Sequence, residues 1–127
     1  MFDWRRPTNL GVRDKRLAPC RRTPNCVSSQ ADPADREHYI QPMVFNGSIS
    51  DLKSVVAEMP GATIVREEAN YLYAEYRTRL MRFVDDLELF LDGATLHVRS
   101  ASRLGRRDFG VNRARVEKLR ALIQARR

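Results

Sequence analysis

Three consecutive stretches of the chain alternate between apolar and polar residues, and this pattern constrains the fold more than any other feature. The stretches are residues 71–80 (YLYAEYRTRL), 85–92 (DDLELFLD) and 95–102 (TLHVRSAS). Alternation with a period of two predicts strands that turn one face to a core. Asp92-Gly93 favours a tight turn between the last two stretches. The sequence therefore predicts an antiparallel sheet.

Two helical patterns flank these strands. Ser48-Ile-Ser-Asp51 has the form of a helix-capping sequence, with apolar residues at helical spacing up to Met59 and a break at Pro60-Gly61. A second apolar stripe follows Asn112, and residues 62–68 alternate weakly. Each helix has one apolar stripe to bury, so both are expected on the leucine face of the sheet. The prediction is an α+β fold with an antiparallel sheet of four to five strands and two helices on one face. This order is compatible with a TATA-binding-protein-like topology.

Residues 1–38 contain four prolines in addition to Gly11, and no period runs through them. We expect an irregular N-terminal arm over residues 1–38, packed on a single α+β domain over residues 39–127. A short strand is expected at 39–45, at an edge of the sheet because Pro42 lacks a backbone donor.

Charge is distributed unevenly along the 127 residues, which carry a net +7. Residues 1–26 hold seven basic and two acidic residues, residues 99–127 hold ten and two, and the segment between them is acidic. Basic ends favour an anionic small molecule or an acidic protein as partner, whereas the acidic middle argues against a continuous nucleic-acid stripe. No apolar run approaches the length of a membrane span, so we expect no membrane span, a cytoplasmic location, and a monomer or weak dimer.

Three motifs occur in order: RLAPCRRTPNCVSSQ, YLYAEYRTRLMRFVDDLELFLD and LHVRSASRLGRRDFGVNRARVEKLRA. Together they resemble the uncharacterised family catalogued as domain of unknown function 1499, from about Leu10 to Leu122. The chain departs from the family at Arg21, where relatives often carry a second proline, and it begins without the N-terminal membrane segment or transit peptide of some members. The resemblance implies no known activity.

The two cysteines, Cys20 and Cys26, lie on either side of Pro24. A turn at Thr23-Pro24-Asn25 would let them form a disulfide, whereas a reducing cytoplasm would keep them as thiols. Their spacing to His38 matches no compact zinc finger, and the C-x-x-C spacing of oxidoreductases is absent. We therefore predict no metal site and a structural loop, with a small thiol-dependent or redox enzyme as the alternative.

The polar face of the predicted sheet combines tyrosine, arginine and carboxylate side chains, which could hold an anionic or planar ligand. The alternative is a solvated sheet face, or a face covered by the arm, in which case the tyrosines become its packing surface. A second candidate is the arginine-rich loop SASRLGRRDFGVNRAR before the last helix, where helix N–H groups could bind an anion. Alternatively, Asp108 or Asn112 caps that helix.

The function expected from these residues is a non-enzymatic binding module for an anionic ligand or acidic partner, with no catalytic residue and no cofactor. A nucleic-acid-binding domain is the other alternative. The candidate ligand-binding residues are Tyr71, Tyr73, Arg77, Arg79, Arg99, Ser100, Ser102, Arg103 and Arg113.

Overall fold

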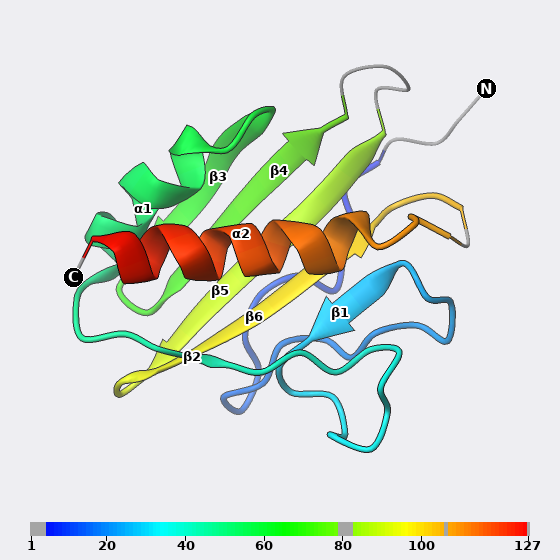
Figure 1. The fold of residues 1–127 in the computed structure, drawn as a ribbon, viewed down its shortest axis with the longest axis horizontal. Helices are drawn as coiled ribbons and strands as arrows, with labels where there is room; N and C mark the ends of the chain where they lie inside the picture. Colours follow the sequence, from blue (N-terminus) through cyan, green and yellow to red (C-terminus); the bar gives the residue numbers. More distant parts are fainter. Residues whose placement is uncertain (1–4, 79–82, 106, 127) are drawn as a thin grey trace.

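The computed structural model describes residues 5–78, 83–105 and 107–126. Within them one sheet and two helices form the body of the protein (Figure 1). In chain order the elements are β1 (Cys26–Ser28), β2 (Met43–Val44), α1 (Ile49–Glu58), β3 (Ala62–Glu68), β4 (Tyr71–Arg77), β5 (Val84–Asp92), β6 (Thr95–Ser102) and α2 (Val111–Ala125).

The sheet runs in the order β1-β6-β5-β4-β3, with every neighbouring pair antiparallel, and β2 pairs with a separate part of β6. The predicted α+β class is therefore confirmed. The described residues form six strands rather than four or five, because two short segments share β6, at Ala101 for β1 and at Leu96 for β2. The TATA-binding-protein-like topology stays a prediction.

The short strands differ from the sequence expectation in length and position. β1 lies inside the segment predicted to be irregular, because its pairing comes from the edge of β6 and not from a local pattern. The strand expected over 39–45 shrinks to Met43–Val44. Pro42, which has no N–H group to donate, directly precedes it.

Both helices pack on the same face of the sheet (Figure 1). α1 begins at a capping box, in which Ser48 accepts a bond from the Asp51 backbone and the Asp51 carboxylate accepts one from the Ser48 N–H. Its buried stripe includes Leu52 and Val56, and that of α2 includes Leu119. These residues join the leucines of β4, β5 and β6 in the main core. Neither helix in the described residues is long and apolar enough to cross a bilayer.

The N-terminal arm covers the other face of the sheet (Figure 1). Leu17 of the arm is buried against Tyr71, Tyr73 and Phe90, and Leu10 packs at the edge of this second apolar cluster. Within the arm, the Gln30 side chain, two residues after β1, accepts from the Leu17 N–H at 2.8 Å and donates to the Lys15 carbonyl at 2.9 Å, which links this part of the arm to the edge of the sheet. The polar face predicted from the alternation is thus covered, and the two tyrosines form its packing surface.

Candidate functional site

Charged side chains are buried on the face that lies under the arm. Glu75 of β4, Asp86 and Glu88 of β5 and Arg99 of β6 point to this face, and Arg103 follows the end of β6. They meet because the register pairs Glu75 with Asp86 and Glu88 with Arg99. Carboxylates and guanidiniums removed from water need partners to offset the cost of desolvation. These buried charged side chains form two groups, which differ in how completely their members are hydrogen-bonded and ion-paired.

The first group is fully paired and centres on Arg103. Its guanidinium donates to both oxygens of Asp86, at 2.9 and 3.0 Å, and also to Glu75. The Tyr73 hydroxyl donates to Asp86, and Arg6 of the arm donates to Glu75 at 2.9 Å. Burial alone would lower the pKa of Arg103, but these hydrogen bonds outweigh it and the pKa is raised.

The second group consists of Glu88 and Arg99 and is incompletely paired. Glu88 Oε2 accepts from the backbone N–H of Gly11, at 2.8 Å, and the Tyr71 hydroxyl donates to the same oxygen at 2.6 Å. Glu88 Oε1 lies 3.7 Å from Arg99 Nη1, too far for a hydrogen bond. Neither this oxygen nor Arg99 Nε has a hydrogen-bond partner among the described residues. Buried polar atoms are rarely left in this state.

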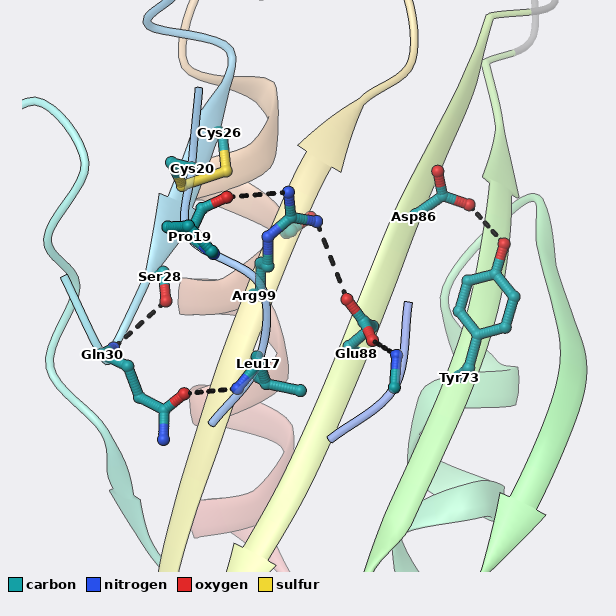
Figure 2. Close-up of polar contacts among 12 residues, drawn as sticks. Leu17, Pro19, Cys20, Cys26, Ser28, Gln30, Tyr73, Asp86, Glu88 and Arg99 are labelled. Carbon is teal, nitrogen blue, oxygen red and sulfur yellow. Dashed lines mark hydrogen bonds and ion pairs between the residues drawn. A yellow bond between two sulfur atoms is a disulfide. The ribbon is translucent and has the colours of Figure 1, made fainter. Parts of the chain in front are cut away.

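The environment of Arg99 disfavours its charge. Its side chain is 8% exposed, and its best hydrogen bond is a long one, 3.4 Å from Nη2 to the Pro19 carbonyl (Figure 2). Burial lowers the pKa of Arg99, the carboxylates of Glu88 and Asp86 offset part of the effect, and the positive charge of Arg21 adds to it. The pKa of Glu88 is raised, again mainly by burial. An anion beside Arg99 would therefore gain a charge-assisted contact that the protein itself does not supply.

A cavity of about 210 Å³, which we call the arm–strand pocket, lies next to Arg99. Its walls come from three parts of the chain: the arm, the loop that contains the cysteines, and the ends of β5 and β6. The lining residues are Arg5, Pro7, Asn9, Arg21, Asn25, Cys26, Asp86, Arg99, Ala101, Ser102, Arg103 and Leu104. Four arginines and one carboxylate therefore surround the cavity.

A disulfide between Cys20 and Cys26 fixes one wall of the arm–strand pocket, with the two Cα atoms 5.6 Å apart. On one side of the loop, the Asn25 side chain donates to the carbonyls of Leu104 and Gly105. On the other side, Pro19 directly precedes Cys20 and contacts Arg99 (Figure 2). The bridge thus holds Arg21, which directly follows Cys20, at the pocket.

The family model described as protein of unknown function (DUF1499) matches residues 16–123, most of the chain. The chain belongs to this family. The resemblance inferred from the three sequence motifs is thereby confirmed, and the matched range includes the disulfide loop and both β strands of the pocket wall. Comparison with curated proteins and with solved structures gave no match.

The structure brings some of the predicted ligand-binding residues together. Arg99, Ser102 and Arg103 line the arm–strand pocket, while Tyr71 and Tyr73 lie under the arm and donate to Glu88 and Asp86. No sequence pattern pointed directly to Arg5 or Arg21 as wall residues. Only the place of Arg21 inside the cysteine loop could have suggested it.

Other predicted residues lie apart from this pocket. Ser100 is on the helix-covered face and is hydrogen-bonded to Asn112 of α2 at 2.6 Å. Arg113 of α2 donates to the carbonyls of Arg36 and Glu37, and Arg77 is exposed at the end of β4. Arg79 lies outside the described residues.

The N-terminus of α2 already has a carboxylate beside it. Asp108 accepts from the Gly110 N–H at 2.9 Å, and from the backbone and side-chain amides of Asn112 at 3.0 and 2.7 Å. Capping by Asp108 therefore prevails at this loop over an open anion site. The histidines are also bonded, His38 to Asp35 and His97 to Ser29, and no cluster of three metal-ligating side chains occurs in the described part of the chain.

Proposed function

We propose that this protein is a binding module for a small anion, which it holds in the arm–strand pocket. The observation that carries the proposal is Arg99, a buried guanidinium with long contacts to Glu88 and Pro19 and an unpartnered Nε. Burying a cation is costly unless it is paired and hydrogen-bonded. A bound anion in the arm–strand pocket would offset the charge of this guanidinium.

Arg21 and Arg99 are the residues expected to recognise the anion. Arg103 also lines the arm–strand pocket, but its charge is already satisfied by Asp86 and Glu75. Arg21 is exposed, and its charge disfavours that of Arg99, so an anion in contact with both guanidiniums would relieve this repulsion. A planar guanidinium group can donate two parallel hydrogen bonds to two oxygens of one carboxylate or phosphate.

The size of the cavity limits the ligand. At about 210 Å³ it is smaller than the pockets of roughly 300–1,000 Å³ that enclose drug-sized molecules. The proposal therefore concerns small phosphorylated or carboxylated compounds and inorganic anions. It does not require a chemical reaction.

Thermal unfolding of the full chain tests the proposal, with phosphate, sulfate, citrate and succinate as probes at constant ionic strength. A ligand at about 100 times its Kd adds about 2.7 kcal/mol to the free energy of unfolding. We expect saturable stabilisation by at least one probe. The Arg21→Gln variant should bind that probe about tenfold more weakly, since one charge-assisted hydrogen bond contributes at least about 1.5 kcal/mol.

Arg22→Gln is the matched control. Arg22 is also exposed and carries the same charge, but it does not line the arm–strand pocket. Phosphate and sulfate also stabilise proteins by exclusion from their surface, and that effect would be equal in both variants. Equal responses of the two variants, or no saturable response to any probe, would contradict the proposal.

A further inference from the structure

The two sulfurs of the Cys20–Cys26 disulfide have different surroundings. Cys20 is partly exposed and lines a second cavity, of about 410 Å³. Cys26 lies in β1, is 3% exposed and lines the arm–strand pocket instead. Thiol–disulfide exchange depends on access to the sulfur that is attacked. A thiol that approaches through the second cavity therefore reaches Cys20 and not Cys26.

The charges around the second cavity do not oppose an attacking thiolate. Its charged and titratable lining residues are Arg16, Arg21, Arg22, Asp32, Asp35 and His38. Three arginines thus face two aspartates, and Asp35 is also hydrogen-bonded to His38 at 2.7 Å. The positive charges at least balance the negative ones, so an anionic sulfur meets no net repulsion at Cys20.

Cys26 is a neighbour of the buried guanidinium of Arg99. In the β1–β6 register Cys26 is opposite Ala101, two residues after Arg99, so Cys26 and Arg99 are diagonal neighbours on one face of the sheet. Both line the arm–strand pocket, and Arg99 donates to the Pro19 carbonyl next to the disulfide (Figure 2). A thiolate at Cys26 would therefore lie close to a cation that has only long contacts to other groups.

The charges that face Cys26 in the arm–strand pocket favour an anion. They come from Arg5 of the arm, Arg21 of the cysteine loop, Asp86 of β5, Arg99 of β6 and Arg103 after β6. Arg103 and Asp86 belong to the paired group with Glu75 and Arg6, in which two positive and two negative charges balance. Glu88 offsets Arg99 only from 3.7 Å, and the two remaining arginines add positive charge. Neighbouring arginines lower the pKa of a cysteine, whereas apolar burial raises it.

Cys26 would keep its position if the disulfide opened. β1 is paired with β6 along its three residues, and the Asn25 carbonyl before it accepts from the Ser102 N–H at 3.0 Å. Arg99 is held on β6, so the Cys26 sulfur and the guanidinium stay neighbours in the reduced protein. Cys20 lies before β1 in a stretch without regular secondary structure, where its sulfur has room to carry an attached thiol.

We infer that the Cys20–Cys26 bridge is a redox-active disulfide that exchanges with dithiols. One thiolate of the dithiol attacks the Cys20 sulfur, the bond between the two cysteine sulfurs breaks, and Cys26 leaves as a thiolate beside Arg99. The second thiolate of the dithiol then attacks its own partner sulfur in the mixed disulfide, which releases Cys20 and oxidises the dithiol. Two electrons pass from the dithiol to the cysteines. Of the two protons that the dithiol loses, one goes to Cys20 and one to solvent.

This direction of exchange follows from both ends of the bridge. The sulfur with access to thiols is attacked, and the sulfur that forms the more stable thiolate leaves faster. No bound anion takes part in the exchange, so the inference does not rest on the proposed function.

Trapping of mixed disulfides tests which sulfur is attacked. The oxidised full chain is incubated with glutathione, the exchange is stopped with acid, the chain is unfolded, and its free thiols are alkylated. Mass spectrometry should find glutathione on Cys20 and the alkyl group on Cys26, with the reverse arrangement at least about tenfold rarer. Equal amounts of the two arrangements would overturn the inference. So would a bridge that glutathione opens in the urea-unfolded chain but not in the folded one, because the disulfide would then be structural only.

Titration of the two thiols tests the role of Arg99. Cys20→Ser leaves Cys26 as the single thiol and Cys26→Ser leaves Cys20, so the two variants are matched. Thiolate absorbance, with a phosphine as reductant, should give Cys26 a pKa below about 7.5 and at least about 1 below that of Cys20, against about 8.5 for an unperturbed cysteine. Arg99→Gln in the Cys20→Ser background should raise the pKa of Cys26 by about 1 or more.

Arg22→Gln in the same background is the control, because Arg22 does not line the arm–strand pocket, and it should leave the pKa of Cys26 unchanged. Circular dichroism shows whether the Arg99→Gln variant is folded, and if it is not, the comparison of the two cysteines decides alone. A pKa of Cys26 equal to or above that of Cys20 would overturn the inference. All of these measurements are made in chloride buffers, so failure of the anion proposal would leave their outcome unchanged.

Discussion

Arg99 and Arg103 are four residues apart on the same face of the protein, yet their environments differ. Arg103 donates to Asp86 and Glu75 in short bonds, whereas Arg99 has, among the described residues, Glu88 at 3.7 Å and the Pro19 carbonyl at 3.4 Å. Strand alternation predicts that Arg99 points to this face, but it makes no prediction for Arg103, which follows the strand, and it cannot predict which arginine finds carboxylates at hydrogen-bond distance. That difference depends on side-chain geometry between strands, and it is what singles out Arg99.

His38 gives a prediction at the residue scale. Its Nδ1 lies 2.7 Å from Asp35 Oδ2 and its Nε2 lies 2.9 Å from the Thr23 carbonyl, so both nitrogens act as donors when the ring is protonated. Burial would lower the pKa of His38, but the bonds to Asp35 and Thr23 outweigh it and the pKa is raised. The hydrogen bond to His38 in turn lowers the pKa of Asp35. A raised pKa means that the stabilisation is fully present below about pH 6.5, the unfolded value, and is lost as the pH rises through the folded value.

We therefore expect Asp35→Asn to lower the urea midpoint of unfolding at acidic pH and to have a smaller effect at alkaline pH. The measurement is a series of urea titrations of the wild type and the variant at pH values from acidic to alkaline. Asp32→Asn, a nearby exposed carboxylate that does not contact His38, serves as control. A difference between wild type and Asp35→Asn that grows with rising pH would disprove this role of His38.

At the scale of elements, the alternating stretches predict β4, β5 and β6 and the faces of their side chains, because a strand buries one face over several residues. The capping sequence at Ser48 predicts the start of α1 for an equally local reason. β1 could not be predicted in this way, since its three residues form a strand only because the edge of β6 is there to pair with Cys26 and Ser28. The arm–strand pocket depends on this long-range pairing, and so its Arg21 and Asn25 could not be identified from spacing alone.

The disulfide loop supplies a prediction at the same scale. In the entropic model, closing a loop of this length adds about 2 kcal/mol to the free energy of unfolding, so Cys20→Ser/Cys26→Ser should lower stability by about that amount. The fold should persist, because β1 stays paired with β6 and Asn25 stays bonded to Leu104 and Gly105. Pro19 and Arg21 lose their main anchor, so trypsin should cleave after Arg21 and Arg22 faster than in the oxidised wild type.

Reduction of the wild type with a dithiol is the control for this variant. It should reproduce both effects in the wild type and leave the double variant unchanged. If the oxidised wild type and the double variant unfold at the same denaturant concentration and are cleaved equally fast, the disulfide does not anchor this segment.

At the scale of the whole molecule, the arm acts as a third layer, with the helices on the opposite face of the sheet (Figure 1). It buries Tyr71, Tyr73 and Phe90, supplies one hydrogen-bond partner of Glu88 through the Gly11 N–H, and forms one wall of the arm–strand pocket. The composition of residues 1–38 predicts an irregular segment, and the scattered apolar residues there predict that this segment packs on the domain. Which face it would cover could not be derived, because a non-repetitive segment has no period to match to a sheet.

If the arm is part of the cooperative unit, replacing its main buried side chain should destabilise the whole protein. Leu17 is 4% exposed, and buried Leu→Ala substitutions cost about 2–5 kcal/mol, so Leu17→Ala should lower the free energy of unfolding within that range.

Tyrosine signals in near-ultraviolet circular dichroism report on the ring packing under the arm, and far-ultraviolet signals report on the sheet and helices. Both should change at one urea midpoint, in the wild type and in the variant. An earlier loss of the tyrosine signal, with the far-ultraviolet transition of Leu17→Ala unchanged, would mean that the arm detaches on its own. The arm–strand pocket would then open and close with the arm, and its affinity for an anion would fall by the fraction of molecules in which the arm is detached.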